Sequence, residues 1–225
     1  MATGGETIPS NIEGLYSIRT DAKLILVVEK DALFQTLLQN SNLKMQNIIL
    51  ITAKGIPDLN TRQLLYRLDR NKTIHRILTK NLKFLINAIH NHSKYLPIYR
   101  LWKSTGIPIF ALVDADPFGI EIMCVYRFGS LTTTWCAESL AVPSVRWLGL
   151  HPSDFPDLNS SQMKGFSKHD EIKCKAILNR PYIEHWPNLK EELEIISSWQ
   201  QKAEIENLAS SAEYILNKII EKEWV

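Results

Sequence analysis

The chain has 225 residues, of which 45% are hydrophobic and 22% are charged, a composition that supports one substantial core and excludes a disordered tail or a fibre. Its formal net charge of +2 excludes binding that depends on a uniformly basic surface. It has three widely spaced cysteines, no basic-then-apolar leader and no apolar stretch of about 18 residues, so we expect an intracellular protein without a membrane span.

Three short apolar runs follow one another along the chain, at residues 24–28, 48–52 and 107–113. Such runs, rich in isoleucine, leucine and valine, are typical of strands buried on both faces of a parallel sheet. Helix signals come after each run: apolar residues at helical spacing, then Asp58 or Asn60 as a cap, then Pro117 with an exit at Gly129. This repeated strand–helix order predicts an α/β fold with right-handed crossovers.

Residues 69–101 interrupt this alternation. The segment carries seven lysines and arginines against one acid, a net charge of +6, and the tripeptide Tyr-Arg-Leu at 66–68 recurs at 99–101. We therefore predict an insertion in the crossover after the second strand. Three interpretations stay open: an amphipathic surface helix, a nucleic-acid-binding arm, and a splicing or gene-model artefact. In the first, the apolar side would comprise Ile77, Leu78, Leu82, Leu85, Ile86 and Ile89.

From residue 151 onward the sequence predicts turns and helices, the helices at 168–179 and 189–222. We expect buried positions in the second helical stretch at Leu193, Ile196, Ile205, Leu208, Ile215 and Ile219. The predicted organisation has three parts. They are an N-terminal lead-in at 1–23, an α/β domain at 24–150 with the insertion at 69–101, and a helical C-terminal region at 151–225 packed on that domain.

Acidic residues follow two of the predicted strands. Glu29 comes directly after the first strand, and Asp114 and Asp116 come after the third. Ligands of open parallel sheets bind beyond the carboxyl ends of the strands, and acids that meet there repel one another unless a cation lies among them. Oxygen ligands without paired histidines or cysteines favour Mg²⁺, which can neutralise a phosphodiester under attack. The alternative is that Glu29 caps the next helix and the aspartates brace a turn.

An apolar strand ending in Glu29, with a later strand ending in Asp114-x-Asp116-x-x-Gly119, resembles the Toprim fold of topoisomerases, primases and related nucleases. Five strings narrow the resemblance to the meiotic double-strand-break transesterases, the eukaryotic relatives of the topoisomerase VI A subunit. They are LILVVEKDALFQTLL (24–38), ITAKGIPDLNTRQLL (51–65), PIFALVDADPFGIEIMCVYRFGS (108–130), VPSVRWLGLHPSD (142–154) and KAEIENL (202–208). The similarity runs in order from about residue 8 to near the C-terminus and leaves out 69–101.

This resemblance implies a nuclear, chromosome-associated protein that cuts double-stranded DNA in meiotic recombination. In that family a tyrosine attacks the phosphodiester and stays joined to the 5′ end, and two subunits each cut one strand. Toprim carboxylates hold Mg²⁺ near the scissile phosphate. The resemblance also implies a homodimer or a heteromer with a topoisomerase VI B-like subunit, and no membrane.

The roles of the family's residues can be assigned to this chain where its residues occupy the matching positions. Glu29, Asp114 and Asp116 match the acids that hold Mg²⁺. Lys54-Gly55 matches the family's loop after the second strand. In that loop a cation and a flexible backbone could approach a phosphate. The candidate DNA contacts are therefore Lys54, Gly55 and, as a further candidate, Lys30.

The tyrosines of this chain do not match the family's pattern around the nucleophilic tyrosine. In the family it lies in a winged-helix domain upstream of the Toprim domain, in an Arg-x-x-Tyr-Tyr-like setting, whereas here the seven tyrosines include no adjacent pair. We therefore expect the nucleophile outside this chain, with Tyr126 the candidate inside it, and expect the chain alone to be inactive. Two other functions stay open: a non-cleaving DNA- or partner-binding short form, and a Toprim metal-dependent nuclease that activates water.

Overall fold

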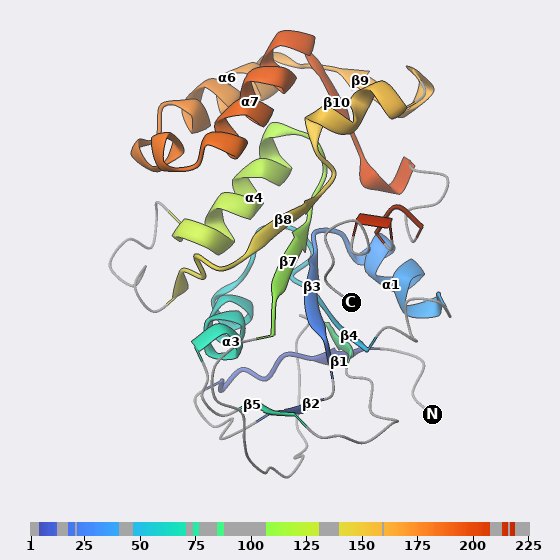
Figure 1. Cartoon of the computed structure of the whole chain (residues 1–225), viewed down its shortest axis with the longest axis vertical. Coiled ribbons are helices and arrows are strands. Elements are labelled where there is room, and N and C mark those ends of the chain that lie inside the picture. The colour runs from blue at the N-terminus through green and yellow to red at the C-terminus, as the bar shows by residue number, and fades with distance from the viewer. Residues whose placement is uncertain are drawn as a thin grey trace.

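Parallel strands form the central sheet of the computed structural model, in the order β1-β6-β4-β3-β7-β8 among the described residues (Figure 1). Their bounds are Glu6–Thr7 (β1), Leu85–Asn87 (β6), Ile48–Thr52 (β4), Leu24–Val28 (β3), Ile109–Leu112 (β7) and Arg146–Gly149 (β8). The structure describes residues 5–12, 18–20, 22–40, 47–70, 74–76, 85–87, 107–130, 140–158, 160–207, 213–215 and 217–218. The parallel sheet confirms the predicted α/β fold.

Strands β4, β3 and β7 form the core of the sheet, and every residue in them is buried. Leu26 of β3 pairs with Leu50 of β4 on one side and with Phe110 of β7 on the other. The three apolar runs in the sequence predict these strands because side chains on both faces of a covered parallel sheet lie in the core. The same pairing brings the carboxyl ends of β4, β3 and β7 to one edge.

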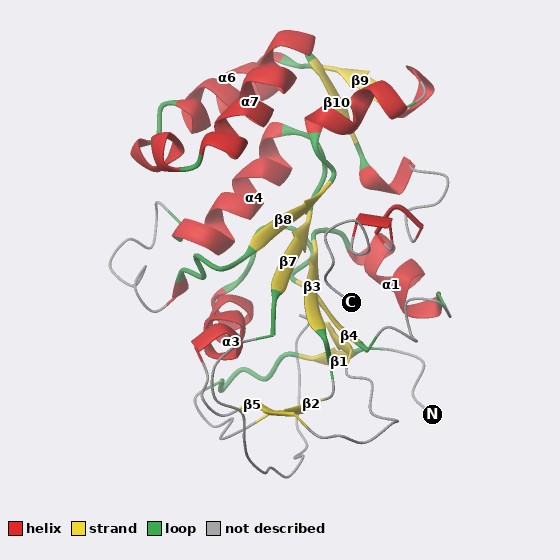
Figure 2. Cartoon of the chain, viewed as in Figure 1, coloured by secondary structure: helices red, strands yellow, loops and turns green. Residues whose placement is uncertain are grey.

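Helices follow the three strands, with bounds Asp31–Gln39 (α1), Leu59–Arg70 (α3) and Pro117–Phe128 (α4). In Figure 2, α1 lies to the right of the strands and α3 and α4 lie to the left. The predicted caps are confirmed: Asp58 accepts a hydrogen bond from the Thr61 N–H at 2.7 Å, and α4 begins at Pro117. Helix α4 ends at Gly129, whose φ of 91° suits a residue without a side chain.

Within the segment 69–101, residues 69–70 end α3, and the interpretation as an amphipathic helix does not hold at the other described residues, 74–76 and 85–87. Residues 74–76 form β5 (Ile74–Arg76), which pairs with β2 (Ile18–Thr20), and residues 85–87 form β6. Strand β6 hydrogen-bonds to β4 within the central sheet, so Leu85 and Ile86 belong to a strand. The physical reason is that the open edge of the buried strand β4 needs main-chain hydrogen-bond partners. Four other positions of the expected apolar side lie outside the described residues: Ile77, Leu78, Leu82 and Ile89. The insertion itself stays a prediction.

In its described residues, the C-terminal part contains two longer helices, a two-stranded antiparallel sheet and short helical stretches at 213–215 and 217–218. Its elements are 3-10 turns at Pro152–Asp157 (η2), Ser160–Gln162 (η3), Pro181–His185 (η4) and Ile205–Asn207 (η5), helices Lys168–Leu178 (α6) and Pro187–Trp199 (α7), and strands Met163–Gly165 (β9) and Gln201–Ala203 (β10). The prediction of a continuous helix over 189–222 is wrong. Gln200 adopts a left-handed conformation with φ 52°, which ends α7 before β10.

The predicted buried positions of this part agree with the structure where it describes them. Leu193, Ile196, Ile205 and Ile215 are fully buried, whereas Leu208 and Ile219 lie outside the described residues. The predicted division at residues 23 and 150 stays a prediction. Among the described residues, no helix has both the length and the apolar character that crossing a membrane requires.

Candidate metal site

Glu29 and Asp114 meet at the carboxyl edge of the sheet. Glu29 directly follows β3, Asp114 lies two residues after β7, and these strands are neighbours with Val28 paired to Leu112. The Asp114 N–H donates to Oε2 of Glu29 at 2.9 Å, and the Glu29 N–H donates to the Leu112 carbonyl oxygen at 3.0 Å. The acids that follow two separate strands therefore lie side by side.

Asp116 lies at the start of α4 and caps that helix. Its Oδ1 accepts a hydrogen bond from the Gly119 N–H at 2.6 Å, so this aspartate holds the turn that begins α4. The alternative expected Glu29 to cap the next helix, but the N-cap residue of α1 is Lys30. Gly119 allows the close approach, because a Cβ atom there would collide with the Asp114 carbonyl oxygen and lie 3.1 Å from Oε2 of Glu29. The spacing Asp-x-Asp-x-x-Gly thus has a steric reason.

Burial and mutual repulsion make Glu29 and Asp116 hard to ionise. Burial raises the pKa of Glu29 to about 7, and the negative charges of Asp114 and Asp116 add to the effect. The pKa of Asp116 is also raised by burial and by the charge of Asp114. A cation at this edge would relieve the repulsion, which is the electrostatic condition that a metal site requires.

Lys30 supplies one positive charge to this edge. Its Nζ lies 2.8 Å from Oδ2 of Asp114, 3.2 Å from Oε2 of Glu204 and 3.9 Å from Oε2 of Glu206. Although burial disfavours its charged form, the hydrogen bond and charge of Asp114 raise the pKa of Lys30 above its usual range. The sequence suggests Lys30 as a DNA contact, which stays a prediction, and the structure places its ammonium among the acids.

Glu204 and Glu206 are acids of this site that sequence reasoning missed. The main chain brings them there: Ala115 and Ala203 exchange two backbone hydrogen bonds of 3.0 and 3.1 Å, and the Ile205 N–H donates to Oδ1 of Asp114 at 3.0 Å. The one available signal was the string KAEIENL, which contributes to the family resemblance. No periodic pattern in the sequence predicts that the segment 202–208 contacts Asp114.

The donor chemistry at this edge fits Mg²⁺, since the side chains offer carboxylate oxygens. Both oxygens of Asp114 already have partners, in the Ile205 N–H and the Lys30 ammonium. As placed, no three acidic, histidine or cysteine side chains of the described residues are arranged to share an ion. Mg²⁺ commonly uses one or two carboxylates and several waters, so Glu29 and Asp116 are the ligands it could use first.

The loop after β4 joins the acid edge through the main chain. The Gly55 N–H donates to the Glu29 carbonyl oxygen at 2.9 Å, and both loop residues have positive φ, 57° at Lys54 and 118° at Gly55. Lys54 is exposed, and its Nζ lies 2.9 Å from Oδ2 of Asp31. A solvated pair of this kind contributes little stability, so the Lys54 ammonium can exchange Asp31 for another anion.

Tyr126 is inaccessible. It is 2% exposed, and burial raises the pKa of its hydroxyl far above the usual range. The hydroxyl of Tyr214 donates to Asp154 at 2.6 Å, and that of Tyr182 accepts from Arg180 at 2.7 Å. One of these three hydroxyl groups is therefore buried and the other two are hydrogen-bonded within the protein. Nothing in these positions favours any of the three as the nucleophile.

Known proteins resemble this chain over nearly all of its length. A family model for the Toprim domain of the topoisomerase 6 A subunit and Spo11 matches residues 24–79 and 90–223. Its internal gap covers residues 80–89, so the match includes 69–79 and 90–101, which the sequence resemblance was expected to leave out. The chain is 39% identical to meiotic recombination protein SPO11 of Mus musculus, over 97% of this chain and 49% of the relative. It is 33% identical to meiotic recombination protein W68 of Drosophila melanogaster, over 96% of this chain and 56% of the relative.

Plant topoisomerases are similar as well. The chain is 30% identical to the A subunit of DNA topoisomerase 6 of Arabidopsis thaliana, over 100% of this chain and 47% of the relative. The chain thus spans about half the length of the curated relatives it matches.

Proposed function

Since the chain belongs to the family of Spo11 and the topoisomerase 6 A subunit through its Toprim domain, we propose that the protein makes double-strand breaks in DNA for meiotic recombination. The proposed chemistry is topoisomerase-type transesterification on double-stranded DNA. Support comes from the relatives that are named for meiotic recombination and from the relatives that are named topoisomerases. The protein would act in the nucleus on chromosomes, as a homodimer or with a topoisomerase VI B-like subunit.

The part of this chain in the reaction is to hold Mg²⁺ at the strand ends. Glu29 and Asp116 would hold the ion, and Asp114 would join them where the Lys30 ammonium pairs with Glu204 instead of with Asp114. When bound, Mg²⁺ neutralises negative charge on the phosphodiester. The observation that carries this proposal is the contact of Glu29 with the main chain of Asp114, which gathers acids from two strands at the edge where ligands of parallel sheets bind.

The loop after β4 positions the DNA backbone in this proposal. Lys54 is exposed and pairs with Asp31 at the surface, so a phosphate can compete for its ammonium. At Gly55 a Cβ atom would meet nothing within 4 Å, which leaves open space next to the main chain. Both residues therefore remain DNA-contact candidates, and Lys30, whose ammonium lies among the acids, is a weaker one.

The nucleophile is proposed to be a tyrosine outside residues 1–225. Carboxylates and Mg²⁺ position groups and neutralise charge, but they supply no attacking oxygen that could remain joined to the 5′ end. Burial of Tyr126 supports this proposal, because a scissile phosphate cannot reach its hydroxyl.

Cleavage of supercoiled plasmid tests the proposal, using the complete protein with its partner subunit in the presence of Mg²⁺. Wild type should leave protein joined to 5′ ends, and Asp116→Asn should reduce cleavage at least about a hundredfold. Asparagine also caps helices well, so this variant keeps the fold. Glu191→Gln, the same change at an exposed position of α7, is the matched control and should cleave as wild type does.

Other outcomes favour the rival functions. Nicks without linked protein that disappear in Asp116→Asn would support a metal-dependent nuclease. DNA binding without any cleavage, in every protein, would support the non-cleaving DNA- or partner-binding form.

A further inference from the structure

Strand β10 connects the two-stranded ribbon of β9 and β10 to the strand-end acids. Figure 1 shows the ribbon above β7 and β8, and Ala203 of β10 exchanges main-chain hydrogen bonds with Ala115. In an antiparallel pair the residues that flank a matched pair also face each other, so Lys202 lies opposite Asp116. In agreement, burial raises the pKa of Asp116 and the positive charge of Lys202 opposes that rise.

The ribbon places a second lysine beside Lys202. In the register of β9 and β10, Lys202 pairs directly with Lys164. Directly paired residues of antiparallel strands have their side chains on the same face, with Cβ atoms about 4.5–5.5 Å apart, and like charges in such a pair repel each other. Asp116, Lys202 and Lys164 thus form a row across three neighbouring segments of main chain. We call Lys202 and Lys164 the lysine pair.

Asp170 fixes the position of Lys202. The Nζ of Lys202 donates to Oδ1 of Asp170 at 2.9 Å and to Oδ2 at 2.8 Å. Asp170 is fully buried near the start of α6, where its Oδ2 also accepts hydrogen bonds from the N–H and the hydroxyl of Ser167. Although burial opposes its charge, these hydrogen bonds lower the pKa of Asp170. The side chain of Lys202 is 24% exposed, and an ammonium has three N–H donors, so one donor remains for a ligand.

Lys164 is held more loosely. Its side chain is 58% exposed, and its Nζ lies 2.7 Å from Oε1 of Glu204. An exposed pair of this kind contributes little stability, so a phosphate can replace Glu204 as the partner of Lys164. Oε2 of Glu204 lies 3.2 Å from Nζ of Lys30, and this contact keeps Glu204 paired when Lys164 turns to another anion.

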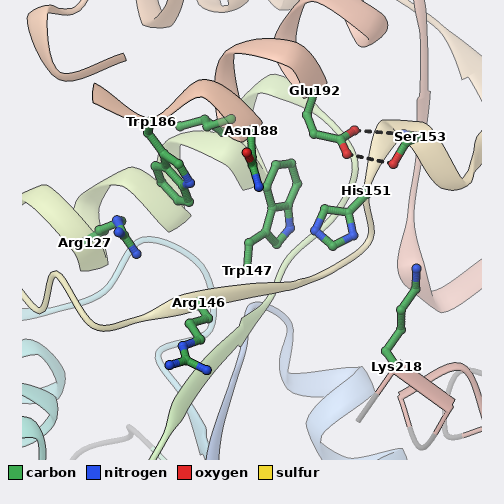
Figure 3. Close-up of a pocket in the computed structure, with 10 residues that line it drawn as sticks. Arg127, Arg146, Trp147, His151, Ser153, Trp186, Asn188, Glu192 and Lys218 are labelled. Carbon is green, nitrogen blue, oxygen red and sulfur yellow. Dashed lines mark hydrogen bonds between the residues drawn. The ribbon is translucent and has the colours of Figure 1, made fainter. Parts of the chain in front are cut away.

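A pocket of about 410 Å³ beside β8 is a less suitable place for a DNA phosphate (Figure 3). Residues of α4, β8, η2 and α7 line it, and the strand-end acids do not. Its Glu192 carboxylate accepts hydrogen bonds from the N–H and the hydroxyl of Ser153, and its Lys218 ammonium lies 2.7 Å from Oδ1 of Asp154. A phosphate there would meet charged groups that already have partners, and it would lie outside the row that begins at Asp116.

On the premise of the proposed function, we propose that the lysine pair binds backbone phosphates of the DNA beside the scissile phosphate. The scissile phosphate would lie at the strand-end acids, and the row continues from Asp116 to Lys202 and Lys164. A lysine ammonium is a compact point charge that binds phosphate oxygens. Lys202, fixed by Asp170, would set the position of the DNA backbone, and Lys164 would exchange Glu204 for a phosphate. Such contacts hold DNA in place without reading its sequence.

An acidic segment of a partner protein is the competing occupant of the lysine pair. DNA is favoured because the row starts at the acids, where the proposed reaction already places a phosphodiester. A peptide carboxylate has no comparable reason to lie at this position.

Fluorescence anisotropy of the full chain with a short labelled DNA duplex, at constant Mg²⁺ concentration and increasing salt, tests the proposal. Lys164→Gln should weaken DNA binding about threefold or more and reduce the steepness of its salt dependence by about one, as expected for one lost phosphate contact. Lys190→Gln is the matched control, because Lys190 also pairs with one glutamate at the surface. This control should bind DNA as wild type does.

Lys202 is tested together with Asp170, because removing the lysine alone would leave a buried carboxylate without its partner. The double variant Lys202→Met/Asp170→Asn keeps the net charge of wild type, and it should also bind DNA more weakly with a smaller salt dependence. Lys190→Met/Glu184→Gln makes the same change at an exposed ion pair and should bind as wild type does. If the first double variant fails to fold, Lys164→Gln decides alone, since Lys164 is exposed.

The binding measurement separates this proposal from the proposed cleavage. If wild type binds DNA and the variants of the lysine pair bind equally well with the same salt dependence, the lysine pair is refuted and the proposed function stands. If wild type does not bind DNA, both are contradicted. Displacement of the labelled duplex by tetraglutamate at a lower concentration than by an unlabelled duplex would assign the lysine pair to an acidic partner and would overturn the proposal.

Discussion

The Nζ atom of Lys30 lies 2.8 Å from Oδ2 of Asp114, at the edge of the sheet where the sequence predicts a metal ion. The two residues follow neighbouring strands, and the lysine side chain turns inward to the aspartate. A divalent cation that uses both oxygens of Asp114 has to displace this ammonium. Lys30 therefore places a cation of the protein itself at the proposed site, and bound Mg²⁺ would compete with it for the same carboxylate.

Replacing Lys30 by methionine tests this competition. Lys30→Met should lower the free energy of unfolding without metal by about 2 kcal/mol, because Asp114 keeps a buried charge and loses its partner. The same variant should bind Mg²⁺ about tenfold more tightly, since no ammonium opposes the ion. Thermal unfolding at increasing Mg²⁺ concentration measures both quantities, because a ligand of the native state raises the melting temperature.

Lys190→Met is the matched control. Lys190 pairs with Glu184 at 2.9 Å and not with an acid of the site, so its removal should leave Mg²⁺ affinity unchanged. If Lys30→Met and wild type respond alike to Mg²⁺ while Asp116→Asn does not respond, the metal site stands and the competition is refuted. If none of the proteins responds, the metal site itself is refuted.

Gly119→Ala should destabilise the protein. A methyl group there would press against the Asp114 carbonyl oxygen, and the resulting shift of α4 should lower the free energy of unfolding by about 2–3 kcal/mol. Gly165→Ala provides the comparison, because a Cβ atom at Gly165 meets nothing within 4 Å. Urea unfolding of the two variants measures the difference, and equal midpoints would show that α4 does not need the close approach.

Because of Asp154, we expect the free energy of unfolding to fall at acidic pH. Burial alone would raise its pKa, but hydrogen bonds from His151, Lys218 and Tyr214 hold the pKa of Asp154 well below its usual range. A carboxylate with a depressed pKa in the folded state stabilises the protein above the unfolded pKa of about 3.9, and this stabilisation is lost as the pH falls further. Asp154→Asn should therefore be about 2 kcal/mol less stable at neutral pH, with a deficit that shrinks below about pH 4.

Urea titrations from neutral pH to pH 3 provide the measurement for Asp154. Glu184→Gln alters an exposed carboxylate that pairs with Lys190 at the surface, and it should leave the pH dependence close to that of wild type. A constant deficit of Asp154→Asn at all pH values would contradict the predicted linkage.

Tyr126→Phe should leave DNA cleavage intact in the complete protein. The ring lies in the core beneath α4, so removing its hydroxyl should change the free energy of unfolding by less than about 1 kcal/mol. Counting protein-linked 5′ ends for the variant and for wild type is the measurement. Loss of these linked ends, with the fold retained by circular dichroism, would identify Tyr126 as the nucleophile.

Much of the fold follows from local sequence patterns. Strands β3, β4 and β7 are predictable because a continuous run of leucine, isoleucine and valine suits a strand covered on both faces. The starts of α3 and α4 are predictable because Asp58 and Pro117 act on the nearest turn of chain. The meeting of Glu29 with Asp114 follows from strand order alone, once the sheet is parallel.

Other features depend on contacts between distant segments. Leu85 and Ile86 fit an apolar helix face as well as a strand, and the open edge of β4 decides between them. The inward turn of Lys30 depends on Glu204 and Glu206, which lie more than 170 residues later in the chain. The pocket beside β8 also combines residues from several elements, so no single stretch of sequence announces it.

The backbone pairing of Ala115 with Ala203 has a consequence for comparing relatives. Its two hydrogen bonds use only main-chain atoms, and both alanines are buried, so other small residues can replace either one without breaking the link. Contacts between side chains leave correlated substitutions in an alignment, whereas this contact leaves none. The main-chain part of the connection between Glu204 and the strand-end acids therefore leaves no covariation signal, and proline at position 203, which removes the donating N–H, is the substitution that would break it.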